Sequence, residues 1–262
     1  MSFEIKNLSG GYGKPDVCKH ISCSISDGEL LCVLGPNGCG KSTLFKLILG
    51  LIKKSSGDIL YQEKSIFNLS ERELAKIIAY IPQQHNPMFA FTVLEVVLFA
   101  RTSHFKNFGS PTKNDVEQAK NALKKLEIYH LAHQNYTTLS GGQRQLVLIA
   151  RALCQDAKIL ILDEPVANLD YANSQKVLSI INLLKKDGYI IIMSTHSPEQ
   201  PFSCAEKVIL MQNGEVFAYG TPFEVLTSEN LYNVYTTDMD IVQVQDRNGT
   251  THTLCVTVEN KD

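Results

Sequence analysis

The sequence predicts an α/β fold with a mostly parallel sheet, an antiparallel β subdomain near the N-terminus and an inserted helical subdomain. Two aliphatic runs with almost no polar residue, 159–162 and 190–194, are typical of strands buried on both faces. Residues 172–186, between these runs, carry apolar side chains at helical spacing. A glycine-rich turn joins a further apolar run, 30–34, to a helical segment at 44–49. Strands that alternate with helices imply a parallel sheet with helices on both faces.

The remaining elements follow from local patterns along the chain. Capping boxes at Ser70-x-x-Glu73, Thr92-x-x-Glu95 and Ser140-x-x-Gln143 each predict the start of a helix. The dipeptides Asn213-Gly214 and Asn248-Gly249 favour tight hairpin turns. The expected strands are 3–8, 17–25, 29–34, 58–61, 207–211, 215–218, 241–245 and 252–258, and the further helices are 112–128 and 143–154.

These patterns also predict the domain organisation. Residues 65–155 are mostly helical by periodicity and interrupt the α/β core. We therefore expect one large domain over residues 1–235, with a helical subdomain at about 85–155, and a C-terminal β-hairpin extension over 236–262.

Composition excludes several classes of protein. The chain has 262 residues, a net charge of −2 and no basic segment, so a nucleic-acid partner is not expected. The seven cysteines are scattered singly without a CxxC pair, which predicts neither zinc nor disulfides, but small core residues in a reducing compartment. No signal peptide is expected from the first residues, and the longest apolar runs are far too short to cross a bilayer.

Residues 35–43, GPNGCGKST, fit the phosphate-binding pattern G-x-x-x-x-G-K-[ST] and predict a P-loop NTPase core. Glycines allow a tight turn whose N–H groups converge on phosphate oxygens, and the helix that follows directs its positive end at the same anion. Lys41 supplies a charge for the β- and γ-phosphates, and the Ser42 hydroxyl is a candidate ligand of Mg²⁺. The nucleotide-binding set is Gly35, Pro36, Asn37, Gly38, Cys39, Gly40, Lys41, Ser42 and Thr43.

A pair of acidic residues follows the buried strand at 159–162. Ligands gather at the carboxyl ends of strands in open α/β sheets. Asp163 is therefore expected to join the Mg²⁺ shell, and Glu164 to polarise an attacking water. Two adjacent carboxylates are often only a solvated strand end, but four aliphatic residues before them and Pro165 after them favour the functional interpretation.

A second candidate anion site begins at Leu139-Ser140-Gly141-Gly142-Gln143. A serine hydroxyl, two glycine amides and a helix N-terminus together can hold a phosphate. This stretch resembles the signature of ATP-binding-cassette (ABC) ATPases. The resemblance covers about residues 2–235 and implies that Ser140, Gly141, Gly142 and Gln143 of one copy close over ATP held by a second copy, in a head-to-tail dimer.

The resemblance assigns roles to further positions. Tyr12 resembles the aromatic residue that stacks on adenine, although an exposed turn tyrosine is the plainer alternative. Gln83 resembles the glutamine that reaches Mg²⁺ and the attacking water, with Gln84 as a rival for that role. His196 resembles the switch histidine that contacts the γ-phosphate. The stretch 168–170 resembles the loop that contacts the partner's site, and it departs mildly from the family pattern in the residues before Leu169.

Together these positions imply an ATPase with ATP and Mg²⁺ as cofactors and with Glu164, His196 and Gln83 as the catalytic set. The sequence of residues 91–101 and 220–235 resembles that of importer ATPases for iron–siderophore complexes, haem, cobalamin or similar metal chelates. The implied partners are integral membrane permease subunits and, indirectly, a substrate-binding protein. The implied location is the cytoplasmic face of the inner membrane, as a peripheral subunit.

Two other function classes fit the sequence less well. A soluble ABC ATPase without a permease, for example in cluster assembly, would lack a hydrophobic docking surface, whereas residues 87–91 are rich in Met and aromatic side chains. A chromosome-maintenance ATPase would separate its motifs by a long coiled coil, but only about a hundred residues lie between Ser42 and Ser140, without sustained heptads.

Overall fold

The computed structural model describes residues 2–83, 90–104 and 110–258. The chain divides into two compact units, one made of residues 1–68 with 190–262 and the other of residues 69–189. The predicted subdomain boundaries at 85–155 and 236–262 stay predictions.

The first unit contains the predicted antiparallel sheet. Its strand order is β2-β1-β4-β5, and all three pairings are antiparallel. Phe3 pairs with Ile25 on one side and with Tyr61 on the other, and all three side chains are buried. The strands are β1 (Ser2–Gly10), β2 (Cys18–Ser26), β4 (Lys54–Tyr61) and β5 (Lys64–Ser65), followed by the short 3-10 helix η1 (Ile66–Asn68).

The first unit also holds the parallel strands on which the phosphate loop is mounted. Strand β3 (Leu30–Leu34) pairs in parallel with β8 (Ile190–Thr195) and with β9 (Lys207–Gln212). Every residue of β3 and β8 is buried, as their aliphatic sequences predict. Helix α1 (Lys41–Ile48) follows β3, and β10 (Glu215–Gly220) pairs antiparallel with β9 around the predicted Asn213-Gly214 turn.

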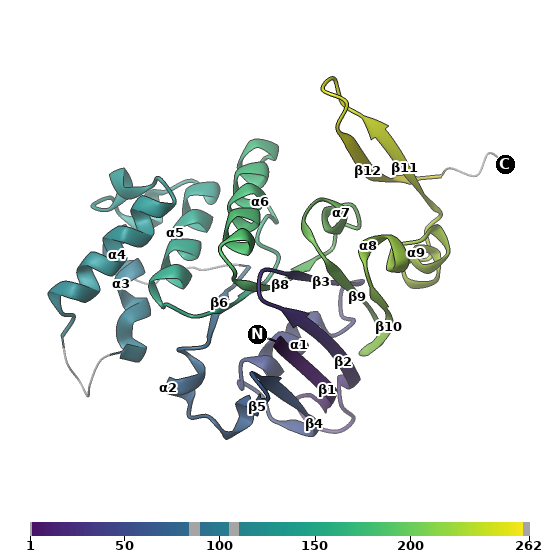
Figure 1. Cartoon of the computed structure of the whole chain (residues 1–262), viewed down its shortest axis with the longest axis horizontal. Coiled ribbons are helices and arrows are strands. Elements are labelled where there is room, and N and C mark those ends of the chain that lie inside the picture. The colour runs from purple at the N-terminus through teal and green to yellow at the C-terminus, as the bar shows by residue number, and fades with distance from the viewer. Residues whose placement is uncertain (1, 84–89, 105–109, 259–262) are drawn as a thin grey trace. The chain divides into compact units, whose positions relative to one another are not determined.

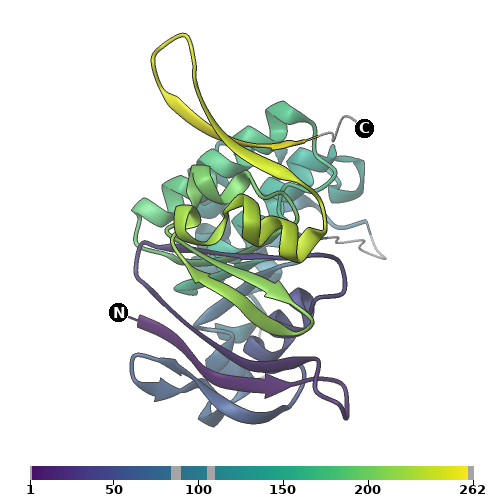
Figure 2. The ribbon, with the colours of Figure 1, turned by 90° about the vertical axis from the view of Figure 1, so that its right-hand side faces the viewer.

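The C-terminal part of the first unit is a set of short helices and a two-stranded hairpin. The hairpin pairs Val242 with Leu254 and extends beyond α8 and α9 in both views (Figure 1 and Figure 2). A capping box at Thr221 and Glu224, which the sequence analysis did not identify, opens α8. The elements are α7 (Gln200–Cys204), α8 (Pro222–Val225), α9 (Ser228–Tyr235), β11 (Met239–Gln245) and β12 (Thr251–Thr257).

The second unit is mostly helical but contains two parallel strands. Strand β6 (Ile78–Ile81) pairs with β7 (Ile159–Leu162) and is a strand that the sequence did not predict within the mostly helical segment 65–155. Four residues are too few for a periodic signal, and tertiary pairing decides their state. Helices α3, α4 and α5 lie side by side (Figure 1). The helices are α2 (Glu71–Leu74), α3 (Val93–Leu98), α4 (Lys113–Lys125), α5 (Gly141–Cys154) and α6 (Tyr171–Lys186), with 3-10 turns η2 (Phe99–His104), η3 (Tyr129–Leu131) and η4 (Tyr136–Thr138).

The predicted capping boxes are confirmed at Ser70, Thr92 and Ser140, because in each the N-cap side chain accepts from the N3 backbone amide and the N3 side chain accepts from the N-cap backbone amide. Helix α4 ends at Lys125 and not at residue 128, since Glu127 has a left-handed φ of 59°. Every helix in the part of the chain that the structure describes is too short or too polar to span a bilayer.

Candidate nucleotide site

The phosphate loop joins β3 to α1 through glycines with positive φ. Gly35, Gly38 and Gly40 have φ values of 152°, 80° and 111°, which L side chains rarely adopt. A Cβ at Gly35 would lie 2.4 Å from the backbone oxygen of Met211 on β9, so only glycine fits against that strand. At Gly38 a Cβ would meet no heavy atom within 4 Å. The loop is therefore clamped against β9 at its start and open at its tip.

Lys41 and the start of α1 complete this loop. The Lys41 ammonium donates to the carbonyl oxygens of Gly35, at 2.7 Å, and Pro36, at 3.2 Å, and only 7% of the residue is exposed. The ammonium is thus held within the loop by its own backbone. Ser42 is exposed and Thr43 is buried. The N-terminus of an eight-residue helix and a fixed ammonium are the features that bind phosphate in such loops.

Cys39 lies inside the loop, at a position that the phosphate-binding pattern leaves open. Its thiol is buried, and burial raises the pKa above its ordinary value although Lys41 opposes the shift. The Cys18 thiol, which donates to the Gly40 carbonyl at 3.5 Å, has its pKa raised by burial to about 12. Both therefore remain protonated near neutral pH and act as small packing groups, as the sequence analysis predicts.

Two more predicted residues lie in the first unit. Tyr12 is 65% exposed in the turn between β1 and β2, and its hydroxyl accepts a hydrogen bond from Lys46 at 2.8 Å. His196 is exposed and directly follows β8. The backbone around it is shaped by Thr195, whose hydroxyl donates to Gln200 at 2.6 Å and accepts from the Ser197 amide at 3.1 Å.

In the second unit, the acidic pair stands at the end of β7 as predicted. The Asp163 amide donates to the Ile81 carbonyl at 2.9 Å, which continues the pairing with β6 and brings residues 80–83 beside the carboxylates. The Gln83 amide donates to a Glu164 carboxylate oxygen at 2.7 Å. The Tyr80 hydroxyl donates to Asp163 at 3.2 Å. The structure therefore brings together the predicted water-directing glutamine and the predicted base.

Two properties of this acidic group bear on catalysis. Glu164 has a φ of 47°, a left-handed conformation that is strained for a non-glycine residue and is concentrated at functional sites. Burial, and then the charge of Asp163, raise the pKa of Tyr80 well above its ordinary value. The Tyr80 hydroxyl thus remains a hydrogen-bond donor to the carboxylate.

The signature residues lie at the start of α5. Ser140 caps this helix by accepting from the Gln143 amide at 3.3 Å, and the Gln143 side chain accepts from the Ser140 amide at 3.0 Å. A Cβ at Gly142 would lie 2.5 Å from the carboxamide of Asn173 on α6, so this position has room only for glycine unless Asn173 moves. Asp170 caps α6 by accepting from the Asn173 amide at 2.8 Å.

The donor atoms fit a magnesium nucleotide. Ser42, Gln83 and Asp163 offer a hydroxyl, an amide carbonyl and a carboxylate, which are the hard oxygen ligands that Mg²⁺ prefers. Among the described residues no group of three or more His, Cys, Asp or Glu side chains is placed to hold a metal ion. Magnesium sites with few protein carboxylates are completed by substrate phosphates and water, so these donor types suit Mg²⁺ that arrives with a nucleotide.

The predicted residues fall into two groups. The loop 35–43, Tyr12 and His196 lie in the first unit, and Gln83, 140–143 and the pair 163–164 lie in the second. The meeting of the two groups around one nucleotide stays a prediction.

Several side chains that lie against predicted site residues were not predicted from the sequence as part of the site, among them Tyr80, Lys46, Asn173 and Cys18. Only Tyr80 carried a signal, as the polar member of an apolar strand two residues before Pro82.

Comparison with known proteins identifies the family. The family model for ABC transporters matches residues 18–167. An uncharacterised ABC transporter ATP-binding protein of Haemophilus influenzae is 41% identical, with 92% of each chain covered, and the molybdate import ATP-binding protein MolC of that organism is 38% identical, with 93% of this chain and 92% of the relative covered.

The iron(3+)-hydroxamate import ATP-binding protein FhuC of Bacillus subtilis is 34% identical, with 92% of this chain and 90% of the relative covered. Among solved structures, a chain of a metal-chelate type ABC transporter in an inward-facing conformation matches with a TM-score of 0.88 and 35% identity, over 99% of this chain and 98% of that one. These matches confirm the predicted fold class and the predicted family. The chain therefore belongs to the ABC transporter family, as one of its ATP-hydrolysing subunits.

Proposed function

We propose that this chain energises a membrane importer for an iron–siderophore complex, haem, cobalamin or a similar metal chelate. The observation that carries the importer assignment is full-length similarity to import ATPases, including the iron-hydroxamate relative at 34% identity. The observation that carries the chemistry is the 2.7 Å hydrogen bond between Gln83 and Glu164, next to Asp163. The names of the molybdate and iron-hydroxamate relatives favour an importer subunit over a soluble ABC ATPase without a permease, because both relatives are import proteins.

The proposed mechanism uses positioning and electrostatics more than covalent chemistry. The loop amides and Lys41 bind the triphosphate of ATP. Glu164 accepts the proton of the attacking water, Gln83 fixes the direction of that carboxylate, and His196 contacts the γ-phosphate. Ser42, Gln83 and Asp163 would hold Mg²⁺, which would neutralise phosphate charge.

The second anion site is proposed to act in a dimer. The resemblance of residues 139–143 to the ABC signature implies two copies of this chain that act together with membrane permease subunits. In a head-to-tail pair of two copies, Ser140, Gly141, Gly142 and Gln143 of one copy close over the nucleotide in the loop of the other. The tight contact of Gly142 with Asn173 supports this role, because it keeps the helix N-terminus free of side-chain bulk.

The permease is proposed to dock beside α3. Phe91 and Phe99 pack edge to face, with ring centroids 4.9 Å apart, and Phe99 is 43% exposed. A partly exposed aromatic pair suits a short helix of a membrane partner. The rival Gln84 and the docking residues Pro87, Met88 and Phe89 lie outside the described residues. The subunit would work as a peripheral protein at the cytoplasmic face of the inner membrane, with a substrate-binding protein that delivers the cargo.

An oxyanion is the second candidate cargo. The molybdate import relative is 38% identical, more than the iron-hydroxamate relative. Co-purification from native membranes, with mass spectrometry of the partners, would identify the permease and the substrate-binding protein. Binding of that protein to a ferric chelate supports the proposal, whereas binding of molybdate alone would assign the oxyanion.

The catalytic assignment is tested with Glu164→Gln. This change keeps the shape and the contact to Gln83 but removes the base, so ATP binding should persist while turnover falls by about a hundredfold or more. Glu117→Gln on the exposed face of α4 is the matched control and should hydrolyse ATP normally. Near-normal turnover by Glu164→Gln would refute the role of Glu164. Lys41→Ala should weaken ATP binding itself, as calorimetry can measure.

A further inference from the structure

Lys46 on α1 holds the side chain of Tyr12 in a defined position. Tyr12 lies in an exposed turn, where a ring that is 65% exposed has few packing contacts to fix its rotamer. The Lys46 ammonium donates to the tyrosine hydroxyl at 2.8 Å and lies 5.3 Å from the ring centroid. An ammonium that is hydrogen-bonded to the hydroxyl and also 5.3 Å from the ring centroid lies beyond the hydroxyl end of the ring. It therefore covers neither face of the ring.

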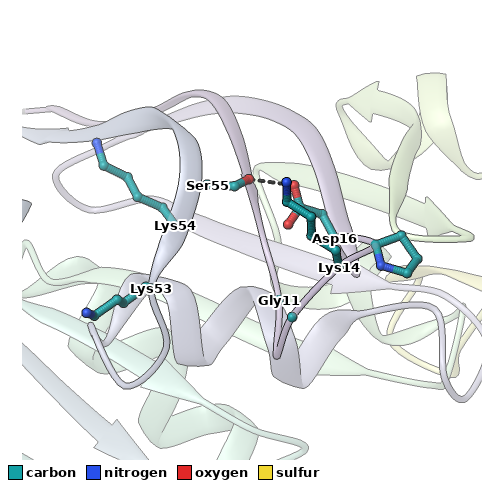
Figure 3. A pocket seen from close by; sticks show the side chains of 8 residues that line it. Gly11, Lys14, Asp16, Lys53, Lys54 and Ser55 are labelled. Carbon is teal, nitrogen blue, oxygen red and sulfur yellow. Dashed lines mark hydrogen bonds between the residues drawn. The ribbon is translucent and has the colours of Figure 1, made fainter.

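The backbone of this turn is fixed separately. The Ser55 hydroxyl donates to the Asp16 carboxylate at 2.5 Å, as Figure 3 shows, and the Val17 amide donates to the Gly10 carbonyl at 3.1 Å. These bonds hold both ends of the turn but do not reach the tyrosine side chain. The orientation of the ring consequently depends on Lys46.

Lys46 also belongs to the helix that begins at the phosphate loop. Lys41 and Lys46 are five residues apart on α1, a rise of about 7.5 Å along the helix axis. Five of the residues from 43 to 48 are buried, so this helix is a rigid support. One helix thus places the phosphate-binding ammonium at its first turn and the tyrosine ring near its end.

We propose that Lys46 is a positioning residue that fixes Tyr12 as the platform for the adenine ring of ATP, an inference that rests on the proposed function. A ring held in place before binding has less rotamer freedom to lose when a base stacks on it. Lys46 itself contacts the hydroxyl and not the nucleotide. It therefore contributes to the affinity for a base-bearing ligand and not to the affinity for phosphates.

Calorimetry with ATP and with tripolyphosphate, which lacks a base, separates these possibilities. Lys46→Met should weaken ATP binding by about three- to tenfold, the range of one hydrogen bond, and change tripolyphosphate binding by less than about twofold. Tyr12→Phe, which keeps the ring but removes the hydroxyl, should show the same loss. The double variant should lose no more than either single variant, because both remove one interaction. Lys46→Arg should restore most of the affinity.

Lys53→Met is the control for loss of a positive charge near the turn that carries Tyr12. Lys53 lines the adjacent pocket, and its side chain extends away from Gly11 in Figure 3. The Lys53→Met protein should bind ATP and tripolyphosphate as the unchanged protein does. Equal losses for ATP and tripolyphosphate in Lys46→Met would overturn the proposal in favour of a simple charge effect, and so would unchanged ATP affinity.

The same measurements separate failure of this inference from failure of the proposed function. If the unchanged protein binds neither ligand, the nucleotide site itself is wrong. If it binds ATP, and Lys41→Ala removes that binding while Lys46→Met does not weaken it, only the role of Lys46 is wrong. If thermal unfolding shows that the Lys46→Met protein folds poorly, Lys46→Gln takes its place in these measurements.

Discussion

A buried ion pair in the second unit offers a quantitative test of how its helices are held together. The Arg101 Nε donates to Asp115 Oδ1 at 3.0 Å, with about a tenth or less of either side chain exposed. Arg101 also donates to the Cys154 carbonyl at the end of α5, at 3.1 Å. Asp115 in turn caps α4 by accepting from the Thr112 hydroxyl and amide. One guanidinium therefore links η2, α4 and α5.

The loss in the free energy of unfolding that we expect for Arg101→Met follows from these contacts. The methionine keeps the apolar stem but leaves Asp115 without its cation and the Cys154 carbonyl without this donor. Breaking a buried ion pair by removing one partner lowers the free energy of unfolding by about 3–5 kcal/mol. Thr112 still solvates the carboxylate, so we expect about 3 kcal/mol, the lower end of that range.

Asp115→Asn should also destabilise the protein, because it leaves the guanidinium without its anion. The double variant removes both charges. Its free energy of unfolding should fall by less than the sum of the two single-variant losses, and the difference, the coupling energy, should be about 1–3 kcal/mol. Lys124→Met is the control. Lys124 pairs with Glu117 at 3.6 Å with more than half of each side chain exposed, and such a pair contributes about 0–1 kcal/mol.

The pH dependence gives an independent check. Hydrogen bonds from Thr112, and then the Arg101 guanidinium, lower the pKa of Asp115 from 3.8 to about 2. Because the folded pKa lies below the unfolded one, this stabilisation is fully present above pH 3.8 and is lost as the pH falls towards 2. Urea unfolding followed by circular dichroism measures all of these quantities. A free energy of unfolding for Arg101→Met within about 1 kcal/mol of the unchanged protein would refute this account of the ion pair.

Three further predictions concern the nucleotide site. Gly35→Ala should raise the Kd for ATP by on the order of tenfold, because its Cβ would meet the Met211 oxygen at 2.4 Å; calorimetry measures the change, and an unaltered Kd contradicts the clamped-loop reading. Tyr80→Phe should lower kcat/KM by about three- to tenfold and raise the Mg²⁺ concentration needed for half-maximal ATP hydrolysis, since Asp163 loses a donor; an unchanged Mg²⁺ dependence counts against this role. Gly142→Ala should reduce steady-state hydrolysis by about tenfold or more while calorimetry finds ATP still bound, and Gly141→Ala, whose Cβ would lie an ordinary 3.5 Å from Leu169, should have the smaller effect; the reverse order would contradict the contact between α5 and α6.

The sequence alone determined the features that depend on neighbouring residues. The phosphate loop, the capping boxes at Ser70, Thr92 and Ser140, and the Asn213-Gly214 hairpin each rest on residues within a few positions of one another. Their geometry follows from backbone conformation and short-range hydrogen bonds, which the local sequence encodes. The family resemblance rests on the same kind of short motif, and the comparisons with known proteins confirm it.

Tertiary structure decided the contacts between residues far apart in the chain. Strand β6 exists because four residues pair with β7, about eighty positions later, and that pairing brings Gln83 to Glu164. The contacts of Lys46 with Tyr12 and of Gly142 with Asn173 likewise join separate elements. No local pattern marks such partners, because side-chain packing between elements is set only when the whole chain folds.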